Sequence, residues 1–281
     1  MSVAISKARP LVLVGAGKMG GAMLQGWLES GLPEGSVHVI DPGLDERQRT
    51  DLEARGVVVH AVADDVPTPL LLMLAIKPQM MSSVLPGLAG FAKRENAHDM
   101  MVLSVAAGTT VATLSSAFGS QVLIIRAMPN TPALVGRGVT ALYPAATLLD
   151  EQKSFVAELL AAIGIVVWVD NEAAIDAVTA VSGSGPAYVF HMVEAMAAAA
   201  EKQGLPADVA MILARETVVG SGELLHQSAD PAATLRKNVT SPNGTTAAGL
   251  GVLMADDGLG PLVEKTVRAA HDRAIELGKE A

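Results

Sequence analysis

The stretch Leu11–Gly26, LVLVGAGKMGGAMLQG, decides the fold. Its first four residues are apolar and predict a short buried strand, and apolar residues recur at helical intervals after the glycines. Gly15, Gly17 and Gly20 follow the G-x-G-x-x-G spacing of a dinucleotide-binding loop. The first glycine permits a tight turn, the second lets a pyrophosphate approach the backbone, and the third lets the helix pack on its strand. We therefore expect phosphates at the start of this helix, where backbone N–H groups are unpaired.

The composition bounds the possible functions. The chain has 281 residues, enough for two domains with a substantial core. Hydrophobic residues make up 50% of it, yet no apolar run approaches the roughly 18 residues of a membrane span. The opening MSVAISKARP lacks the apolar core of a secretory signal, so we expect a cytoplasmic protein without a membrane segment. The net charge of −9 argues against nucleic acid, and the lack of cysteine excludes disulfides, thiolate metal sites and cysteine nucleophiles. We expect no metal.

The second apolar run, Val37–Ile40, ends at Asp41, which lies 21 positions after Gly20 (41 − 20). An acidic residue near this distance hydrogen-bonds the adenosine ribose in dinucleotide-binding proteins. Such a carboxylate favours NADH, because it would repel the additional phosphate of NADPH. The Asp-Pro-Gly sequence here is also typical of a turn, which is compatible with that role. Arg47 and Arg49 follow and could hold the additional phosphate, so NADPH or NADH both stay open.

Further apolar runs predict a doubly wound, mostly parallel sheet of the Rossmann type. The clearest is Leu70–Ile76, LLLMLAI, which suits burial on both faces. Because ligands bind outside the carboxyl ends of such strands, we expect the loops after them to line the cofactor crevice. Small residues after the strand Met101–Val105 would let a flat nicotinamide lie against the backbone. The other expected strands are Val57–Val59, Val122–Ala127, Val139–Tyr143 and Ile165–Val169. The expected cofactor-binding residues are Gly15, Gly17, Lys18, Met19, Gly20, Asp41, Ala75, Ile76, Lys77, Pro78, Ala106, Ala107 and Asn130.

The strand signal disappears from Asn171 onward. We therefore expect a dinucleotide-binding domain over residues 1–169 and a helical domain for dimerisation and substrate binding over residues 170–281. The glycines of Ser182–Tyr188 are expected to separate its first two helices. The run Ala195–Ala200 fits close contact between subunits, and a buried intramolecular helix explains it nearly as well. The expected helices are Ala173–Val181, Ala187–Gln203, Ala207–His226 and Leu262–Leu277.

The loop Thr240–Thr246, TSPNGTT, precedes a further helical stretch, AAGLGVLMA. It offers hydroxyl groups and unpaired backbone N–H groups at a helix start, which together suit an anion. Helix capping alone needs one Ser or Thr, whereas this loop carries four. We therefore expect a carboxylate site here.

Six blocks of the sequence resemble the pyrroline-5-carboxylate reductase family: GAGKMGGAM, AIKPQ, SVAAG, IRAMPNTPALVGRGVTAL, DAVTAVSGSGPAYVF and NVTSPNGTTAAGL. They occur in the expected order along nearly the whole chain. The resemblance implies a Rossmann-type domain and an all-helical domain that interlocks with a second subunit in a homodimer, and such dimers often assemble into decamers. It also implies reduction of 1-pyrroline-5-carboxylate to L-proline with NADPH or NADH, the final step of proline biosynthesis.

The resemblance extends to individual residues. It implies that the substrate carboxylate is held by Ser241, Gly244, Thr245 and Thr246, with Asn238 lining the same pocket. Thr246 would hydrogen-bond the ring nitrogen and is the expected catalytic residue. Glu172 falls near an acidic position of the substrate pocket, and Lys77, Pro78, Ala106 and Ala107 match the nicotinamide-side loops.

Three positions depart from the family pattern. Asn243 stands where the family commonly has a glycine. Asp41 stands where many relatives carry a small hydroxylated or neutral residue, and Val58 where an asparagine often touches the adenosine. The last two departures weaken the expectation of a preference for NADPH.

Two other functions share parts of this pattern. A beta-hydroxyacid dehydrogenase has the same glycine opening and two-domain plan, but places a catalytic lysine on the first long helix of its second half. Here Tyr188–Met196, YVFHMVEAM, has no lysine, although His191 could act as a base. A non-catalytic dinucleotide-binding redox sensor would need only the glycine loop and a dimer interface, which leaves Thr240–Thr246 without a role.

Overall fold

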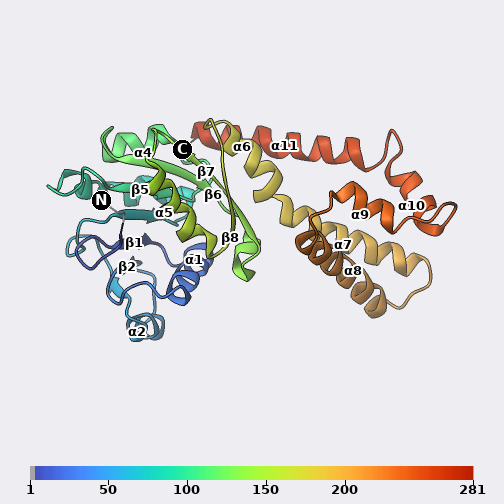
Figure 1. Ribbon diagram of the computed structural model, residues 1–281, viewed down its shortest axis with the longest axis horizontal. Helices are drawn as coiled ribbons and strands as arrows, with labels where there is room; N and C mark the ends of the chain where they lie inside the picture. The colour runs from blue at the N-terminus through green and yellow to red at the C-terminus, as the bar shows by residue number, and fades with distance from the viewer. Residues whose placement is uncertain (1–3, 281) are drawn as a thin grey trace. The chain divides into compact units, whose positions relative to one another are not determined.

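The computed structural model describes residues 4–280 and divides the chain into two compact units (Figure 1). The first unit holds the chain up to Gly183 together with its last residues from His271, and the second holds Ser184–Ala270. The domain boundary expected at residue 170 stays a prediction. No helix within residues 4–280 has the length and apolar character needed to cross a membrane.

Within the described residues, the first unit is built on an eight-stranded sheet in the order β3-β2-β1-β4-β5-β6-β7-β8. Strands β1 to β6 are parallel, β7 runs antiparallel to β6, and β8 runs parallel to β7. The order reverses beside β1, as in dinucleotide-binding folds, so the predicted fold class is confirmed. The strands are β1 (Leu11–Val14), β2 (Val37–Ile40), β3 (Val58–His60), β4 (Leu71–Leu74), β5 (Met101–Ser104), β6 (Leu123–Met128), β7 (Gly138–Pro144) and β8 (Gly164–Trp168).

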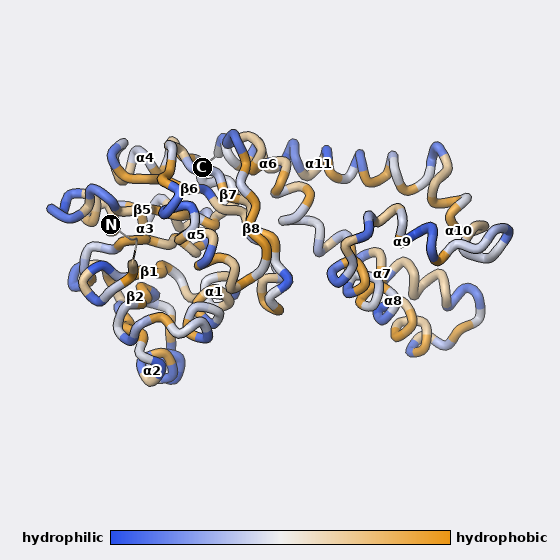
Figure 2. Tube along the Cα trace, in the orientation of Figure 1, coloured by the Kyte–Doolittle hydropathy of each residue, from blue (hydrophilic) through white to orange (hydrophobic). Residues whose placement is uncertain are grey.

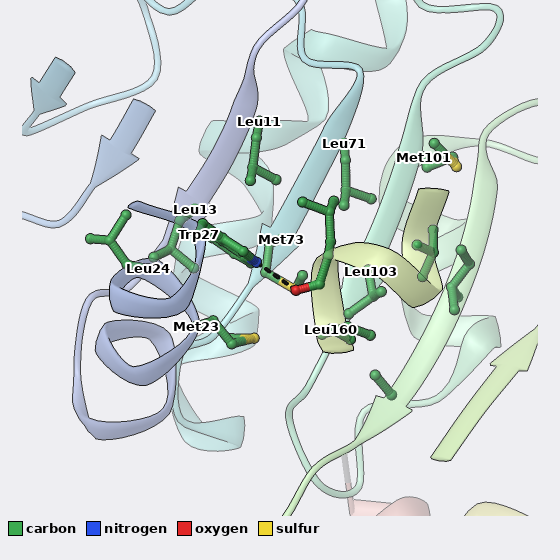
Figure 3. Packing of buried hydrophobic residues seen from close by; sticks show 14 of the residues in the cluster. Leu11, Leu13, Met23, Leu24, Trp27, Leu71, Met73, Met101, Leu103 and Leu160 are labelled. Carbon is green, nitrogen blue, oxygen red and sulfur yellow. Dashed lines mark hydrogen bonds between the residues drawn. The ribbon is translucent and has the colours of Figure 1, made fainter. Parts of the chain in front are cut away.

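Helices cover both faces of this sheet, because its central strands are apolar on both sides. One core lies between the sheet and the helices α1 (Lys18–Glu29) and α5 (Asp150–Ala161). Trp27 lies fully buried there, and its Nε1–H donates to the backbone oxygen of Leu159 at 2.8 Å (Figure 3). The other core packs against α3 (Met81–Leu88) and α4 (Val111–Phe118). The remaining helical segments of this unit are α2 (Glu46–Ala54), the 3-10 turns η1 (Pro78–Met80), η2 (Ala89–Lys93) and η3 (Thr131–Val135), and α6 (Ala174–Val178).

The second unit consists of helices. They are α7 (Gly185–Lys202), α8 (Ala207–Gln227), α9 (Ala232–Asn238), α10 (Thr245–Leu253) and the first part of α11 (Leu259–Glu280). The helix α9, which forms one side of the turn before α10, was not expected from the sequence. Its seven residues are too few for a clear apolar period.

The break expected at Ser182–Tyr188 is present but narrow: it is confined to Ser184, and α7 begins at Gly185 with Pro186 in its first turn. Thr179–Gly183 forms a π-helical turn, η4, and Ser184 keeps helical dihedral angles of −84° and −23°. The hydroxyl of Ser182 donates to the backbone oxygen of Val178 at 3.1 Å, so the polar side chain bonds within the helix rather than ending it. The absence of a side chain at Gly183 lets Met128 pack against this turn, because a Cβ there would lie 2.5 Å from Cε of Met128.

Candidate active site

The glycine loop is tightly packed on its protein side and open on the other. Gly15 has a φ of +89°, and a Cβ there would lie 2.9 Å from the backbone oxygen of Ala75. A Cβ on Gly20 would lie 2.0 Å from the backbone oxygen of Gly15, so this glycine lets α1 approach the loop. A Cβ on Gly17 would have no neighbour within 4 Å. The space beside Gly17 therefore lies open at the positive end of α1, which no side chain caps, as the expected phosphate site requires.

The loops after neighbouring parallel strands meet at one edge of the sheet. The Ala75 N–H donates to Val14 O at 2.8 Å, and the Val105 N–H donates to Leu74 O at 3.0 Å, so the loops after β1, β4 and β5 lie in a row. Residues Ala75–Pro78, expected beside the cofactor, and Ala106–Ala107, expected near the nicotinamide, belong to this row. Lys77 in it is exposed. Lys18 and Met19 lie in the first turn of α1.

A cleft of ≈ 420 Å³ opens beside these loops within the first unit. Its lining combines two residues expected at the cofactor, Pro78 and Ala107, with Thr109 and with Leu277 from the last turns of α11. The last expected cofactor residue, Asn130, follows β6. Its Oδ1 accepts from the Val139 N–H at 2.9 Å, so this side chain fixes the start of β7.

Asp41 braces the glycine loop. Its Oδ2 accepts from the Ala16 N–H and its Oδ1 from the Gly43 N–H, both at 2.8 Å. The turn expected at Asp41 is present, and the hydrogen bond expected between its carboxylate and the adenosine ribose stays a prediction. Each oxygen keeps a lone pair, so a ribose hydroxyl can still donate to it.

A histidine pair lies beside Asp41, and sequence reasoning missed it. The Asp41 N–H donates to His60 O at 3.1 Å, and Nε2 of His60 lies 2.9 Å from Nδ1 of His38. Burial, and next the neighbouring His60, lower the pKa of His38. Burial also lowers the pKa of His60; Arg49 lowers it further, and Asp65 opposes the shift. The residues are 22 positions apart, so only the pairing of β2 with β3 brings them together.

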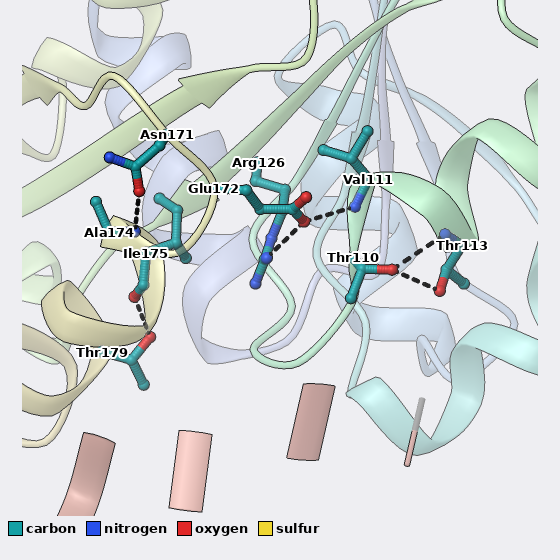
Figure 4. A network of polar contacts seen from close by, with 9 residues as sticks. All are labelled: Thr110, Val111, Thr113, Arg126, Asn171, Glu172, Ala174, Ile175 and Thr179. Atoms are coloured by element: carbon teal, nitrogen blue, oxygen red, sulfur yellow. Dashed lines mark hydrogen bonds and ion pairs between the residues drawn. The ribbon is translucent and has the colours of Figure 1, made fainter. Parts of the chain in front are cut away.

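Glu172 is hydrogen-bonded within the first unit (Figure 4). Its Oε1 accepts from Nη1 of Arg126 at 2.7 Å and from the Val111 N–H at 2.8 Å. The resemblance implied a place in the substrate pocket for Glu172, and that role stays a prediction. Arg126 was not among the expected site residues. Its signal in the sequence is a charged residue within the apolar strand β6, LIIRAM.

The residues expected at the substrate carboxylate form one turn of the second unit. Asn238 ends α9, the Gly244 N–H donates to Ser241 O at 3.1 Å, and α10 begins at Thr245. Gly244 is extended, with no side-chain cap, so the first N–H groups of α10 have no side-chain acceptor. Thr246, in that first turn, is exposed.

The departure at Asn243 has a conformational explanation. Asn243 has a φ of +59°, and it is the one non-glycine residue with a positive φ in the part of the chain that the structure describes. Glycine adopts this left-handed conformation freely, and asparagine is among the side chains that tolerate it best. The loop therefore keeps a glycine-like backbone with asparagine in place of glycine.

The sheet order and the glycine loop at the start of α1 define a dinucleotide-binding protein of the Rossmann class. Residues 10–108 match the family model described as NADP oxidoreductase coenzyme F420-dependent, and residues 172–277 match that of pyrroline-5-carboxylate reductase dimerisation. The pyrroline-5-carboxylate reductase of Pseudomonas aeruginosa is 38% identical over 270 residues, which cover 96% of this chain and 97% of the relative. This chain belongs to the pyrroline-5-carboxylate reductase family.

Solved structures agree with this membership. A pyrroline-5-carboxylate reductase from Coxiella burnetii superposes with a TM-score of 0.86 at 32% identity, covering 96% of this chain and 98% of that one. Plasmodium falciparum pyrroline carboxylate reductase, solved with NADP bound, superposes with a TM-score of 0.77 at 26% identity. That match covers 97% of this chain and 99% of the other.

Proposed function

We propose that this chain reduces 1-pyrroline-5-carboxylate to L-proline with hydride from NADPH or NADH. The observation that carries the proposal is the match to the family, which extends over 96% of the chain at 38% identity. The conformation of the glycine loop supports it, because the space beside Gly17 would admit a pyrophosphate. NADP in the Plasmodium falciparum relative supports NADPH, while the carboxylate of Asp41 supports NADH.

The residues of the chain would bind and orient the reactants. When bound, the reduced nicotinamide supplies the hydride. The backbone N–H groups and hydroxyls of Ser241, Thr245 and Thr246 would hold the substrate carboxylate at the start of α10. The Thr246 hydroxyl would hydrogen-bond the ring nitrogen, with water as the final source of the proton. Holding both partners in one geometry lowers the barrier by avoiding the entropy cost of their encounter.

The two alternative functions have less support. Helix α7 has no lysine before Lys202 in its last turn, and a beta-hydroxyacid dehydrogenase needs one near its start. His191 is exposed, and its Nδ1 lies 3.0 Å from Oε2 of Glu194 on the same helix. A non-catalytic sensor gives no role to the turn at Ser241–Thr246, with its uncapped helix start.

The test is turnover by the purified protein. Mixed with the imine and either cofactor, the wild type should consume reduced nicotinamide at a rate that depends on the imine concentration. Thr246→Ala should lower kcat at least tenfold. The matched control is Thr217→Ala, because the Thr217 hydroxyl bonds to Leu213 O within α8. Binding of cofactor without turnover would favour the sensor, and full activity of Thr246→Ala would remove the role of its hydroxyl.

We further propose that the second unit forms a homodimer. Large apolar side chains stand exposed along it, among them Phe190, Leu224 and Val252 at 64%, 64% and 73%. Figure 2 shows apolar residues along α7 and α8 as well as along the strands of the first unit. Exposure of this extent is typical of surfaces that a partner covers, and the dimerisation model matches this region. Light scattering at micromolar concentration should give a dimer or a multiple of it, such as a decamer, and a monomer would contradict the proposal. A cytoplasmic location stays a prediction.

A further inference from the structure

We propose that Arg126 and Glu172 are a positioning pair that fixes the loop Ala106–Thr109 for the nicotinamide half of the cofactor. This inference rests on the proposed function, and it gives Glu172 a task other than binding substrate. Neither residue need touch a ligand in this role. Both act through the loop between β5 and α4.

Arg126 is buried deeply enough that its charge needs a partner of opposite charge. The side chain of Arg126 is 6% exposed and that of Glu172 is 34% exposed. A guanidinium in the interior of a sheet is costly unless it is paired and hydrogen-bonded. Glu172 provides this pairing through Oε1, at 2.7 Å from Nη1 of Arg126 (Figure 4). Losing either partner would leave the other charge uncompensated.

Glu172 holds the end of the loop, and Arg126 holds Glu172. At the start of the loop, Ser104 Oγ accepts from the Ala106 N–H at 3.3 Å, and Ser104 is the backbone register partner of Arg126 on the neighbouring strand β6. At its end, Glu172 Oε1 accepts from the Val111 N–H at 2.8 Å, at the first residue of α4. A carboxylate at a helix start also interacts favourably with the helix dipole. The pair therefore joins β6 to the end of the loop, where α4 begins.

The loop itself has little room to adapt. Gly108 has a φ of +76°, and a Cβ there would lie 3.3 Å from Leu277 O on α11. Thr110, the residue directly before α4, caps that helix: its Oγ1 accepts from the Thr113 N–H at 3.1 Å. The backbone at Ala106 and Ala107, expected against the nicotinamide, therefore lies between a bond to Ser104 at the start of the loop and the contacts of Leu277 and Glu172 at its end. Loss of the ion pair should shift this loop while the glycine loop after β1 keeps its own contacts.

The experiment separates the two halves of the cofactor. Calorimetric titration measures Kd for NADH and NADPH and for the corresponding fragments without nicotinamide, ADP-ribose and 2′-phospho-ADP-ribose. Glu172→Ala should weaken binding of the complete cofactor about tenfold, since it leaves a buried donor unpaired. The fragments should bind within about twofold of wild type, because they end before the loop. Glu172→Gln keeps an acceptor of the same size and should restore part of the loss.

The matched control is Asp99→Asn. Asp99 also pairs with an arginine, Arg9, but both precede their strands and so lie at the opposite edge of the sheet. This variant should leave every Kd unchanged. An increase in KM for the imine with unchanged cofactor Kd would overturn the inference and place Glu172 at the substrate. Equal weakening of cofactor and fragment would also overturn it, in favour of a general structural role. A wild type that binds cofactor without turnover would refute the proposed function and leave this comparison intact.

Discussion

Gly17 and Gly20, two glycines of the G-x-G-x-x-G motif, should respond to substitution by alanine in different ways. A Cβ on Gly20 would lie 2.0 Å from the backbone oxygen of Gly15 and 3.2 Å from the Cβ of Ala75. An ordinary contact needs more than 3.4 Å, so Gly20→Ala must push α1 away from the loop by over 1 Å. Overpacking of this kind costs about 1–3 kcal/mol. For a unit of this size the melting temperature should fall by about 2–12 °C.

Gly17→Ala provides the contrast. A Cβ there meets no atom within 4 Å, and Gly17 has a φ of −66° that alanine adopts without strain. The folded protein should therefore melt close to the wild-type temperature. The new methyl group would occupy the space into which a pyrophosphate fits, and Kd for NADPH should rise at least tenfold, about 1.4 kcal/mol. Scanning and titration calorimetry measure the two effects. Wild-type affinity in Gly17→Ala would show that the phosphates do not approach this loop.

Three other substitutions test single features. Asp41→Ser removes the carboxylate at the glycine loop, and the ratio of kcat/KM for NADPH to that for NADH should rise about tenfold; an unchanged ratio would show that Asp41 does not set the preference. Because the pKa values of His38 and His60 lie below the ordinary value of 6.5, the unfolded chain takes up protons first as the pH falls, and stability is lost from about pH 6.5 downward. The melting temperature should fall less between pH 8 and pH 5 in His60→Gln than in wild type, and equal falls would contradict this. Asn243→Ala should lower the free energy of unfolding by about 1 kcal/mol, because alanine is disfavoured at a φ of +59°; Asn243→Gly, measured by the same urea denaturation, should leave it nearly unchanged.

Features set by neighbouring residues could be predicted from the sequence. The run LVLV before Gly15 and the helix after it are such features, and β1 and α1 lie where they were expected. The direction of β7 could not be predicted, because it depends on pairing with β6 rather than on its own pattern.

Contacts between residues far apart in the sequence could not be predicted, for the same reason. Arg126 and Glu172 are 46 positions apart, and no local pattern connects them. The helical turn at Thr179–Gly183, which makes the break expected at Ser182–Tyr188 so narrow, has another cause. Serine and glycine usually end helices, but here the serine hydroxyl bonds to the preceding turn and the glycine admits Met128. A tertiary contact therefore outweighed a local preference.

The chain contains two tryptophans, and both belong to the first unit. Trp27 is fully buried on α1, and Trp168 ends β8, partly buried against the same core. Tryptophan fluorescence, excited where tyrosine does not absorb, consequently reports on the first unit, whereas Tyr188 belongs to the second. Tryptophan emission recorded during denaturation would follow the unfolding of the first unit and not that of the helices in the second unit. Because Trp27 lies on the helix that starts at the glycine loop, its emission offers a signal for displacement of α1 that needs no added label.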